Sequence, residues 1–403
     1  MAKLAGIAIA DKNSLFDSGA AFLLSQQCKV NEVIKPNSDC EIEIKSGSPY
    51  VISRIKGASN FSKAFDMAHD AAQIGLDICS GNGIADLSIN NAADECLIWW
   101  RDGSSQVLRV VFTASLKVSI SADIQVTDKN GIVKPQPLPP PVKYHECLRY
   151  FRLSQVADDL FDAYRNMYLA FELLISSKYP KKNGSERKWL EDALKNINKI
   201  LPLSKAFETK GHDIVDEIID ELYEEIRCRL FHAKSSRKRL LPHSLRDRKK
   251  VNEGLRSLTR LVLLLAKDWL NISRGGGGLT YDGFDQATSW MKSNPEILIS
   301  DSVAKLKRDE TLSNPAYKSA VVLPAKFAPE LSEPGLNTVL GTIASTKIKG
   351  LKRTARFALK QRNTLFSVNV LEAKLNCGKI DRLEVQIGIQ LINLRKPKYL
   401  YRC

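Results

Sequence analysis

Two breaks in composition divide this chain more firmly than any other feature. Residues 134–141 read K-P-Q-P-L-P-P-P, and residues 275–278 are four consecutive glycines. A proline-rich run forms a stiff extended spacer, because proline fixes φ and lacks the backbone donor that a helix or a central strand needs. A glycine run is a flexible hinge. We therefore expect an α+β multidomain protein whose middle segment folds apart from both flanks.

The expected organisation has three folded parts joined by two linkers. A chain of 403 residues is long enough for two or three domains, and 44% apolar residues suffice to bury a sizeable core. The parts are an N-terminal mixed α/β domain (1–133), a Pro-rich linker (134–144), a helical domain (145–272), a Gly linker (273–278) and a C-terminal β-rich basic domain (279–403).

Both flanks carry strand signals. In the N-terminal part we predict a helix over Phe61–Cys79, followed by strands at 96–101 and 107–114 with Asp102-Gly103 as a hairpin turn. In the C-terminal part, apolar and polar residues alternate from Leu383 to Leu391. This period of two predicts a strand with one buried face and one wet face.

The middle segment has helical periodicity throughout. Apolar residues recur every three to four positions in four stripes, and Ser185 precedes the second as a cap. Four such helices with short connections predict a four-helix bundle. The stripes run over 160–174, 189–201, 214–226 and 251–269.

The net charge and the cysteines indicate which class of partner and which compartment to expect. The net charge of +15 favours contact with a polyanion, most commonly nucleic acid, although a generally basic protein whose charge only keeps it soluble is the alternative. The eight cysteines lack a C-x-x-C pair, so we expect reduced thiols in a cytoplasmic protein. No signal peptide and no membrane-spanning run are expected. No Walker loop, zinc pattern or nucleotide fingerprint occurs, so we expect neither a cofactor nor a metal.

One segment, residues 213–250, contains side chains that could catalyse a reaction. The third helical stripe holds seven carboxylates between Asp213 and Glu225 and then changes to R-C-R-L-F-H, which places Arg227 and His232 five residues apart. From Lys234 to Lys250 there are eight lysines or arginines and one aspartate. Metal-free RNA cleavage needs a group titrating near neutral pH, a fixed forked cation for the phosphate, and further cations for the polyanion. The segment supplies all three.

An arginine, four residues and a histidine at the end of an acidic helix resemble the R-x(4–6)-H motif of HEPN domains. The upstream stretch D-A-Y-R-N-M-Y-L-A-F-E-L-L, ending at Leu174, is similar to the helix that precedes the motif in bacterial HEPN proteins. The resemblance covers residues 145–272 and so implies a HEPN-like bundle.

The resemblance also implies an activity: a metal-independent endoribonuclease, acting as a homodimer, that leaves 2′,3′-cyclic phosphate ends. Such enzymes serve as toxins or effectors in bacterial antiviral defence, under the control of a regulatory partner or flanking domain. In this chain His232 would be the acid or base, Arg227 the phosphate ligand and Glu172 the residue that orients Arg227. Lys234, Arg237, Lys238 and Arg239 would bind RNA.

Several alternatives stand beside this reading. Many HEPN proteins have Asn, Asp or His after the arginine, whereas this chain has Cys228, which favours a catalytically inactive module that binds RNA or a protein partner.

Residues five apart on an α-helix are separated by about 140°, so the pair converges only if the helix ends near His232 or a partner completes the site. Arg227 could instead pair with Glu224 or Asp220 and His232 cap the helix, and Glu172 could be merely solvated. A small-molecule enzyme in the N-terminal part has no motif in support.

A second basic stretch lies at residues 347–362. It includes Lys352, Arg353 and Arg356, with Phe357 and Phe366 nearby as flat apolar faces. We expect this stretch to be an RNA-guiding surface, and a solvated basic face is the equal alternative.

Overall fold

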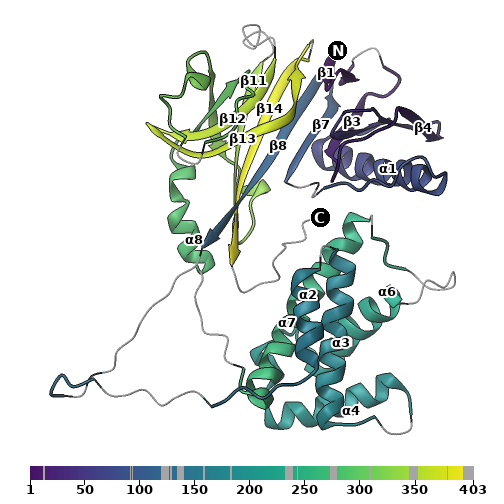
Figure 1. The fold of residues 1–403 in the computed structure, drawn as a ribbon, viewed down its shortest axis with the longest axis vertical. Helices are drawn as coiled ribbons and strands as arrows, with labels where there is room; N and C mark the ends of the chain where they lie inside the picture. The colour runs from purple at the N-terminus through teal and green to yellow at the C-terminus, as the bar shows by residue number, and fades with distance from the viewer. Residues whose placement is uncertain are drawn as a thin grey trace. The chain divides into compact units, whose positions relative to one another are not determined.

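The computed structural model describes residues 1–11, 14–90, 92, 94–118, 127, 129–133, 140–157, 159–181, 184–231, 239–242, 244–272, 279–307, 310–344, 353–378 and 380–393. The chain divides into two compact units (Figure 1). Met1–Lys117 and Leu279–Leu391 form the first, here called the β unit. Val118–Gly278 and Ile392–Cys403 form the second, here called the helical unit. The protein is therefore a mixed α and β structure.

The β unit is built on one 14-stranded sheet. Its strand order is β2-β1-β13-β12-β9-β10-β11-β14-β8-β7-β3-β6-β5-β4. The strands are β1 (Ala2–Leu4), β2 (Ile7–Ile9), β3 (Ser18–Leu23), β4 (Glu32–Asn37), β5 (Cys40–Ile44), β6 (Tyr50–Ile55), β7 (Glu95–Asp102), β8 (Ser105–Val118), β9 (Glu296–Ser300), β10 (Val321–Phe327), β11 (Leu336–Ala344), β12 (Thr354–Gln361), β13 (Thr364–Asn376) and β14 (Arg382–Asn393).

The two flanks of the chain share this sheet, so the prediction of separate N-terminal and C-terminal domains is wrong. β14 lies between β11 and β8, and β1 pairs with β13 through Lys3 and Asn376. Arg109 of β8 also forms an ion pair with Glu384 of β14, with 2.7 Å between Nη2 and Oε2. Each flank alone would leave an unpaired strand edge, and pairing the two removes both edges.

Because β14 is an internal strand of this shared sheet, its burial differs from the predicted alternation of buried and exposed residues. Its apolar residues from Leu383 to Leu391 are buried as expected, but Glu384 and Gln390 on the opposite face are each only 6% exposed. The strand lies in the middle of the sheet and both of its faces are covered. The wet face predicted from the period of two is therefore wrong.

Local signals in the N-terminal flank are confirmed. Helix α1 spans Phe61–Gly81, and the side chain of Asn60 caps it by accepting a hydrogen bond from the Lys63 N–H. The buried face of α1 packs on β3, β6 and β7. β7 and β8 form the predicted hairpin, with Asp102 opposite Ser105 and Gly103 at φ 59°.

The described part of the β unit also contains a short helix and three 3-10 turns. These are α8 (Tyr281–Ala287), η3 (Ser289–Lys292), η4 (Pro315–Tyr317) and η5 (Pro329–Leu331) in this unit, and η1 (Leu203–Lys205) belongs to the helical unit.

The helical unit places each predicted stripe on a helix around one apolar core. The helices are α2 (Cys147–Val156), α3 (Leu160–Lys178), α4 (Glu186–Ile200), α5 (Ile214–Ile218), the π-helix η2 (Ile219–Cys228), α6 (Arg229–Phe231) and α7 (Leu245–Leu270). Ser185 caps α4 as predicted, through the Lys188 N–H. α2 precedes the four predicted helices, so a four-helix bundle does not describe the whole unit.

The two ends of the helical unit lie side by side. The Lys143 N–H donates to the Leu270 carbonyl at 2.9 Å, and the Asn271 side chain donates to the Pro141 carbonyl at 3.0 Å. The chain thus enters and leaves this unit at one place, as expected of a domain inserted between β8 and α8. Within the described segments, no helix has the length and apolar character needed to cross a membrane.

Candidate functional site

The helix that carries Arg227 is not a regular α-helix. Asp213 caps its start by accepting from the Val215 and Asp216 N–H groups, and after five α-helical residues the chain continues as the ten-residue π-helix η2. A π-helix bonds residue i to residue i+5 and occurs mostly as short bulges at functional sites. Residues five apart are consequently closer around the axis of η2 than around that of an α-helix.

Two residues on neighbouring helices, Tyr164 of α3 and Gly254 of α7, pack against the π-helix η2. The Tyr164 hydroxyl, buried on α3, donates to the Leu222 carbonyl at 2.8 Å and so satisfies a backbone acceptor inside η2. Gly254 on α7 faces Ile226, and a Cβ added at Gly254 would lie 2.2 Å from Ile226 Cδ1. A glycine at this position lets α7 and η2 approach closely.

Arg227 forms an ion pair with Glu186 in the first turn of α4. Its Nη2 lies 2.7 Å from Oε1 and 2.9 Å from Oε2. The two side chains are 17% and 22% exposed. Burial is the largest single effect and lowers the pKa of Arg227, but the Glu186 carboxylate together with Tyr168 and Cys228 outweighs it, and the pKa of Arg227 is raised. The guanidinium is a permanent cation held in one place.

Three aromatic rings surround the same guanidinium. Its Cζ lies 5.7 Å from the ring centre of Tyr168, 5.3 Å from that of Tyr223 and 5.4 Å from that of Phe231. Cation–π attraction acts at such distances. The Nε of Arg227 is buried and has no hydrogen-bond partner in the described part of the chain. The arginine is thus enclosed on several sides while one of its donors is unused.

Glu172 lies one helical turn beyond Tyr168 on α3, close to this cluster. Burial raises the pKa of its carboxyl, the Glu186 carboxylate raises it further, and Arg227 opposes both. Glu172 was predicted to orient Arg227, but the direct partner of Arg227 is Glu186. Glu186 could not be singled out from the sequence, because an acidic residue after a serine cap is common at any helix start.

Glu224 and Asp220, the partners considered for Arg227 on its own helix, pair with Arg187 of α4 instead. Arg187 Nε lies 3.2 Å from Glu224 Oε1, and its Nη2 lies 3.6 Å from Asp220 Oδ1. Two adjacent residues of α4, Glu186 and Arg187, therefore bind the helix through opposite charges.

The described residues on either side of segment 232–238 lie at α6. His232, Lys234, Arg237 and Lys238 lie outside the described residues. α6 ends at Phe231, and the Leu240 N–H donates to the Arg229 carbonyl at 3.4 Å. Arg239, which precedes Leu240, is exposed. Phe231 and Leu240 are therefore both held at α6, the short helix that follows η2.

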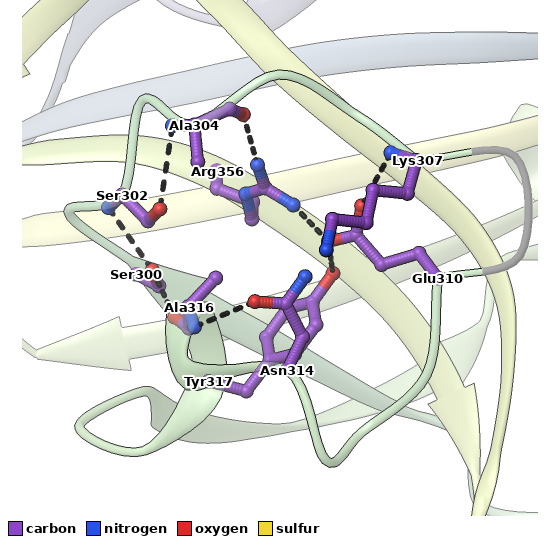
Figure 2. Close-up of polar contacts among 9 residues, drawn as sticks. All are labelled: Ser300, Ser302, Ala304, Lys307, Glu310, Asn314, Ala316, Tyr317 and Arg356. Carbon is purple, nitrogen blue, oxygen red and sulfur yellow. Dashed lines mark hydrogen bonds and ion pairs between the residues drawn. The ribbon is translucent and has the colours of Figure 1, made fainter.

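The second basic stretch is only partly at the surface. Lys352 lies outside the described residues and Arg353 is exposed. Arg356, in contrast, is fully buried: it pairs with Glu310 and donates to the Ala304 carbonyl, both in the segment after β9 that folds over β12 (Figure 2). Phe357 is also fully buried. Neither residue is available to RNA, so including Arg356 in an RNA-binding surface is wrong.

The burial of Arg356 could not be predicted from its neighbours in the sequence, because strand register determines its surroundings. It lies opposite Ser300 of β9 and Val370 of β13, in the interior of the sheet. The sequence shows its charge but not the carboxylate of Glu310, which is 46 residues away.

The fold and the site together define a β unit with an inserted helical unit that holds an enclosed arginine. Comparison with protein families places one match on that insert: the family described as methylamine utilization protein MauJ matches residues 147–267. The match starts at α2 and ends within α7, and supports a distinct domain in the middle segment. Neither the curated proteins nor the solved structures gave a match.

Proposed function

We propose that the chain is a metal-independent endoribonuclease of HEPN type. The observation that carries this proposal is Arg227 at the end of a π-helix, held by Glu186 and ringed by aromatic side chains. A preorganised cation stabilises the charge that develops on phosphorus oxygens without having to reorganise during the reaction.

The proposed reaction uses the histidine of the motif. His232 takes the proton from the ribose 2′-hydroxyl, or gives one to the leaving oxygen, while Arg227 binds the phosphate. The 2′ oxygen attacks phosphorus, the bond to the 5′ oxygen breaks, and the products carry a 2′,3′-cyclic phosphate and a 5′-hydroxyl.

The helix that follows Arg227 limits how this pair can meet. On an α-helix, residues 227 and 232 would lie about 140° apart. The π-helix η2 ends at Cys228 and the α-helix α6 (Arg229–Phe231) follows, so the pair converges only if the helix ends near His232 or a partner chain completes the site. Helical structure also continues to Phe231, the residue before His232.

Glu172 and the basic residues have proposed roles beside this pair. The raised pKa of the Glu172 carboxyl makes it a second candidate for proton transfer or for orienting Arg227. Arg239, with Lys234, Arg237 and Lys238, would hold the RNA backbone, and Arg353 and Lys352 would extend that surface. Assembly as a homodimer, regulation by a partner protein, a cytoplasmic location and a role in antiviral defence follow from the HEPN resemblance alone.

Cleavage of a labelled RNA by the full chain, with EDTA present, tests the proposal. His232→Ala and Arg227→Ala should each lower the rate by roughly 10²- to 10⁴-fold. His212→Ala and Arg187→Ala are matched controls, since both lie in the helical unit and are exposed. Equal rates for His232→Ala and the unmodified protein would disprove the assignment.

The second candidate is a non-catalytic HEPN module that binds RNA or a protein. The ion pair with Glu186 favours it, because both contacts use Nη2 of Arg227, which a phosphate would otherwise occupy. Cys228 favours it as well, since its thiol is buried where many HEPN proteins have a polar residue. RNA binding without any cleavage by the unmodified protein would establish this role.

A further inference from the structure

A pair of stacked aromatic rings lies on the β unit, apart from the site of the helical unit. The ring centres of Trp290 and Phe366 are 3.6 Å apart, with 15° between the ring planes. Other near-parallel pairs in the described chain are wider: Phe61–Phe65 and Tyr164–Tyr168 are 6.3 and 6.4 Å apart. Trp290 and Phe366 are therefore in face-to-face contact.

Phe366 is 41% exposed although one of its faces is covered. Since Trp290 occupies one face, the exposed area comes from the ring edge and the opposite face. A single exposed phenylalanine is ordinary on a protein surface, but this ring is one member of a stacked pair. A free, flat apolar face on an already stacked pair suits a third ring.

A β-bulge presents this ring. Leu359 pairs with Ser367 and Lys360 pairs with Leu365, so Phe366 is the extra residue between them. Bulges are enriched at sheet edges and re-aim a side chain. Here β13 also pairs with β1 only near Leu375, so the edge beside Phe366 has no partner among the described strands.

Two basic residues lie close to the stacked pair along the chain. Lys292 lies two residues after Trp290 in η3, and its Nζ lies 5.2 Å from the ring centre of Phe327. Arg362 is in the turn between β12 and β13, with φ 51°. Gln361 donates to the Ser293 carbonyl at 2.8 Å and so joins these two segments. In the described part of the chain, neither Lys292 nor Arg362 has a carboxylate partner.

We propose that Trp290 and Phe366 form a stacking platform for an unpaired base of single-stranded RNA, with Lys292 and Arg362 contacting its phosphates. Proteins that bind single strands without sequence preference combine aromatic faces with a positive surface in this way. The platform does not depend on cleavage at Arg227. It gives the β unit a role of its own: holding an unpaired strand.

Binding of a fluorescent 2′-O-methyl-uridine 12-mer to the full chain, followed by anisotropy, tests the platform. The 2′-O-methyl groups prevent 2′-hydroxyl attack, so the result is independent of the proposed ribonuclease activity. Losing one stacked base should weaken binding by roughly 5- to 150-fold in Phe366→Ala. Phe366→Trp should restore binding, which separates stacking from mere folding. Val322→Ala, an exposed apolar residue of β10 that lacks a ring, is the matched control.

Two further measurements separate the contribution of base stacking to affinity from that of the phosphate contacts. A 12-mer of abasic sugar-phosphate should bind the unmodified protein as weakly as the uridine strand binds Phe366→Ala. Lys292→Ala and Arg362→Ala should each reduce the slope of log affinity against log salt by about 0.7. Equal affinity of the unmodified protein and Phe366→Ala for the uridine strand would overturn the proposal, and so would equal affinity for uridine and abasic strands. A platform that binds a protein instead would give the same two results.

Discussion

The Nη2 atom of Arg227 lies 2.7 Å from Oε1 of Glu186, so the end of the π-helix is tied to the first turn of α4. Both side chains are mostly buried, and a charge-assisted hydrogen bond in such a place is stronger than one in water. The pair fixes the cation before any ligand arrives. It also means that a phosphate must share Arg227 with Glu186.

We expect Glu186→Ala to destabilise the helical unit by about 1–3 kcal/mol, because it leaves the guanidinium of Arg227 partly buried without its carboxylate. Urea unfolding measures this loss. Asp192→Ala, which removes an exposed partner of Lys188 on the same helix, should cost less than about 0.5 kcal/mol. Equal effects of the two changes would mean that the Arg227–Glu186 pair contributes no more than a surface ion pair.

The double variant extends this test. If the two charges interact directly, Arg227→Ala combined with Glu186→Ala should cost less than the sum of the single changes, by about 0.5–3 kcal/mol. Strict additivity would contradict a direct pair.

Sequence predicted the local structure well where a single stretch of residues determines it. The Asp102-Gly103 turn, the Ser185 cap and the apolar stripes of the helical unit depend on neighbours within a few residues, and the structure confirms each of them. Periodicity carries this information because it reflects which side of one element is buried.

Contacts between residues far apart in the sequence could not be predicted in this way. Glu384 is buried because Arg109, 275 residues earlier, reaches it from the neighbouring strand. Arg356 is buried because Glu310 folds over it. Both residues look like surface residues when only the adjacent sequence is considered. The π-helix was missed for a similar reason, since its close packing depends on Gly254 of another helix.

The contact between Gly254 and Ile226 predicts a steric effect. Gly254→Val would place its Cβ 2.2 Å from Ile226 Cδ1 and should destabilise the protein by roughly 1–3 kcal/mol. Shortening the opposing side chain with Ile226→Ala should recover part of that loss in the double variant. Unfolding midpoints in urea give both values. If the double variant is less stable than the sum of the single changes, the close approach is not the cause.

The buried pair of Arg356 and Glu310 predicts a larger effect. Arg356→Ala leaves a carboxylate that is 4% exposed without its cation, and breaking such a pair costs about 3–5 kcal/mol. Arg353→Ala, three residues earlier and exposed, should change the unfolding free energy by less than about 0.5 kcal/mol. A small effect of Arg356→Ala would show that Glu310 reaches water once its partner is gone.

The carboxyl of Glu95 predicts how the free energy of unfolding depends on pH. The Tyr50 hydroxyl donates to Glu95 Oε1 at 2.5 Å, and the two residues lie on strands that flank β3. Burial raises the pKa of the Glu95 carboxyl to about 7, the hydrogen bond from Tyr50 opposes this, and the Glu372 carboxylate adds to it. The folded protein therefore keeps a proton on Glu95 at a pH where the unfolded chain, with a pKa of about 4.5, has lost it.

A raised carboxyl pKa stabilises the fold at low pH, and this contribution disappears as pH rises through the folded value. We expect it to be complete below about pH 4.5 and lost above about pH 7. The free energy of unfolding should fall by about 2–3 kcal/mol over that window in the unmodified protein, compared with Glu95→Gln, whose side chain stays neutral. Urea unfolding at pH 5, 6, 7 and 8 measures the difference. Glu330→Gln, which changes an exposed carboxyl in η5, should keep the unmodified profile. Parallel profiles for Glu95→Gln and the unmodified protein would mean that Glu95 is ionised in the fold at neutral pH.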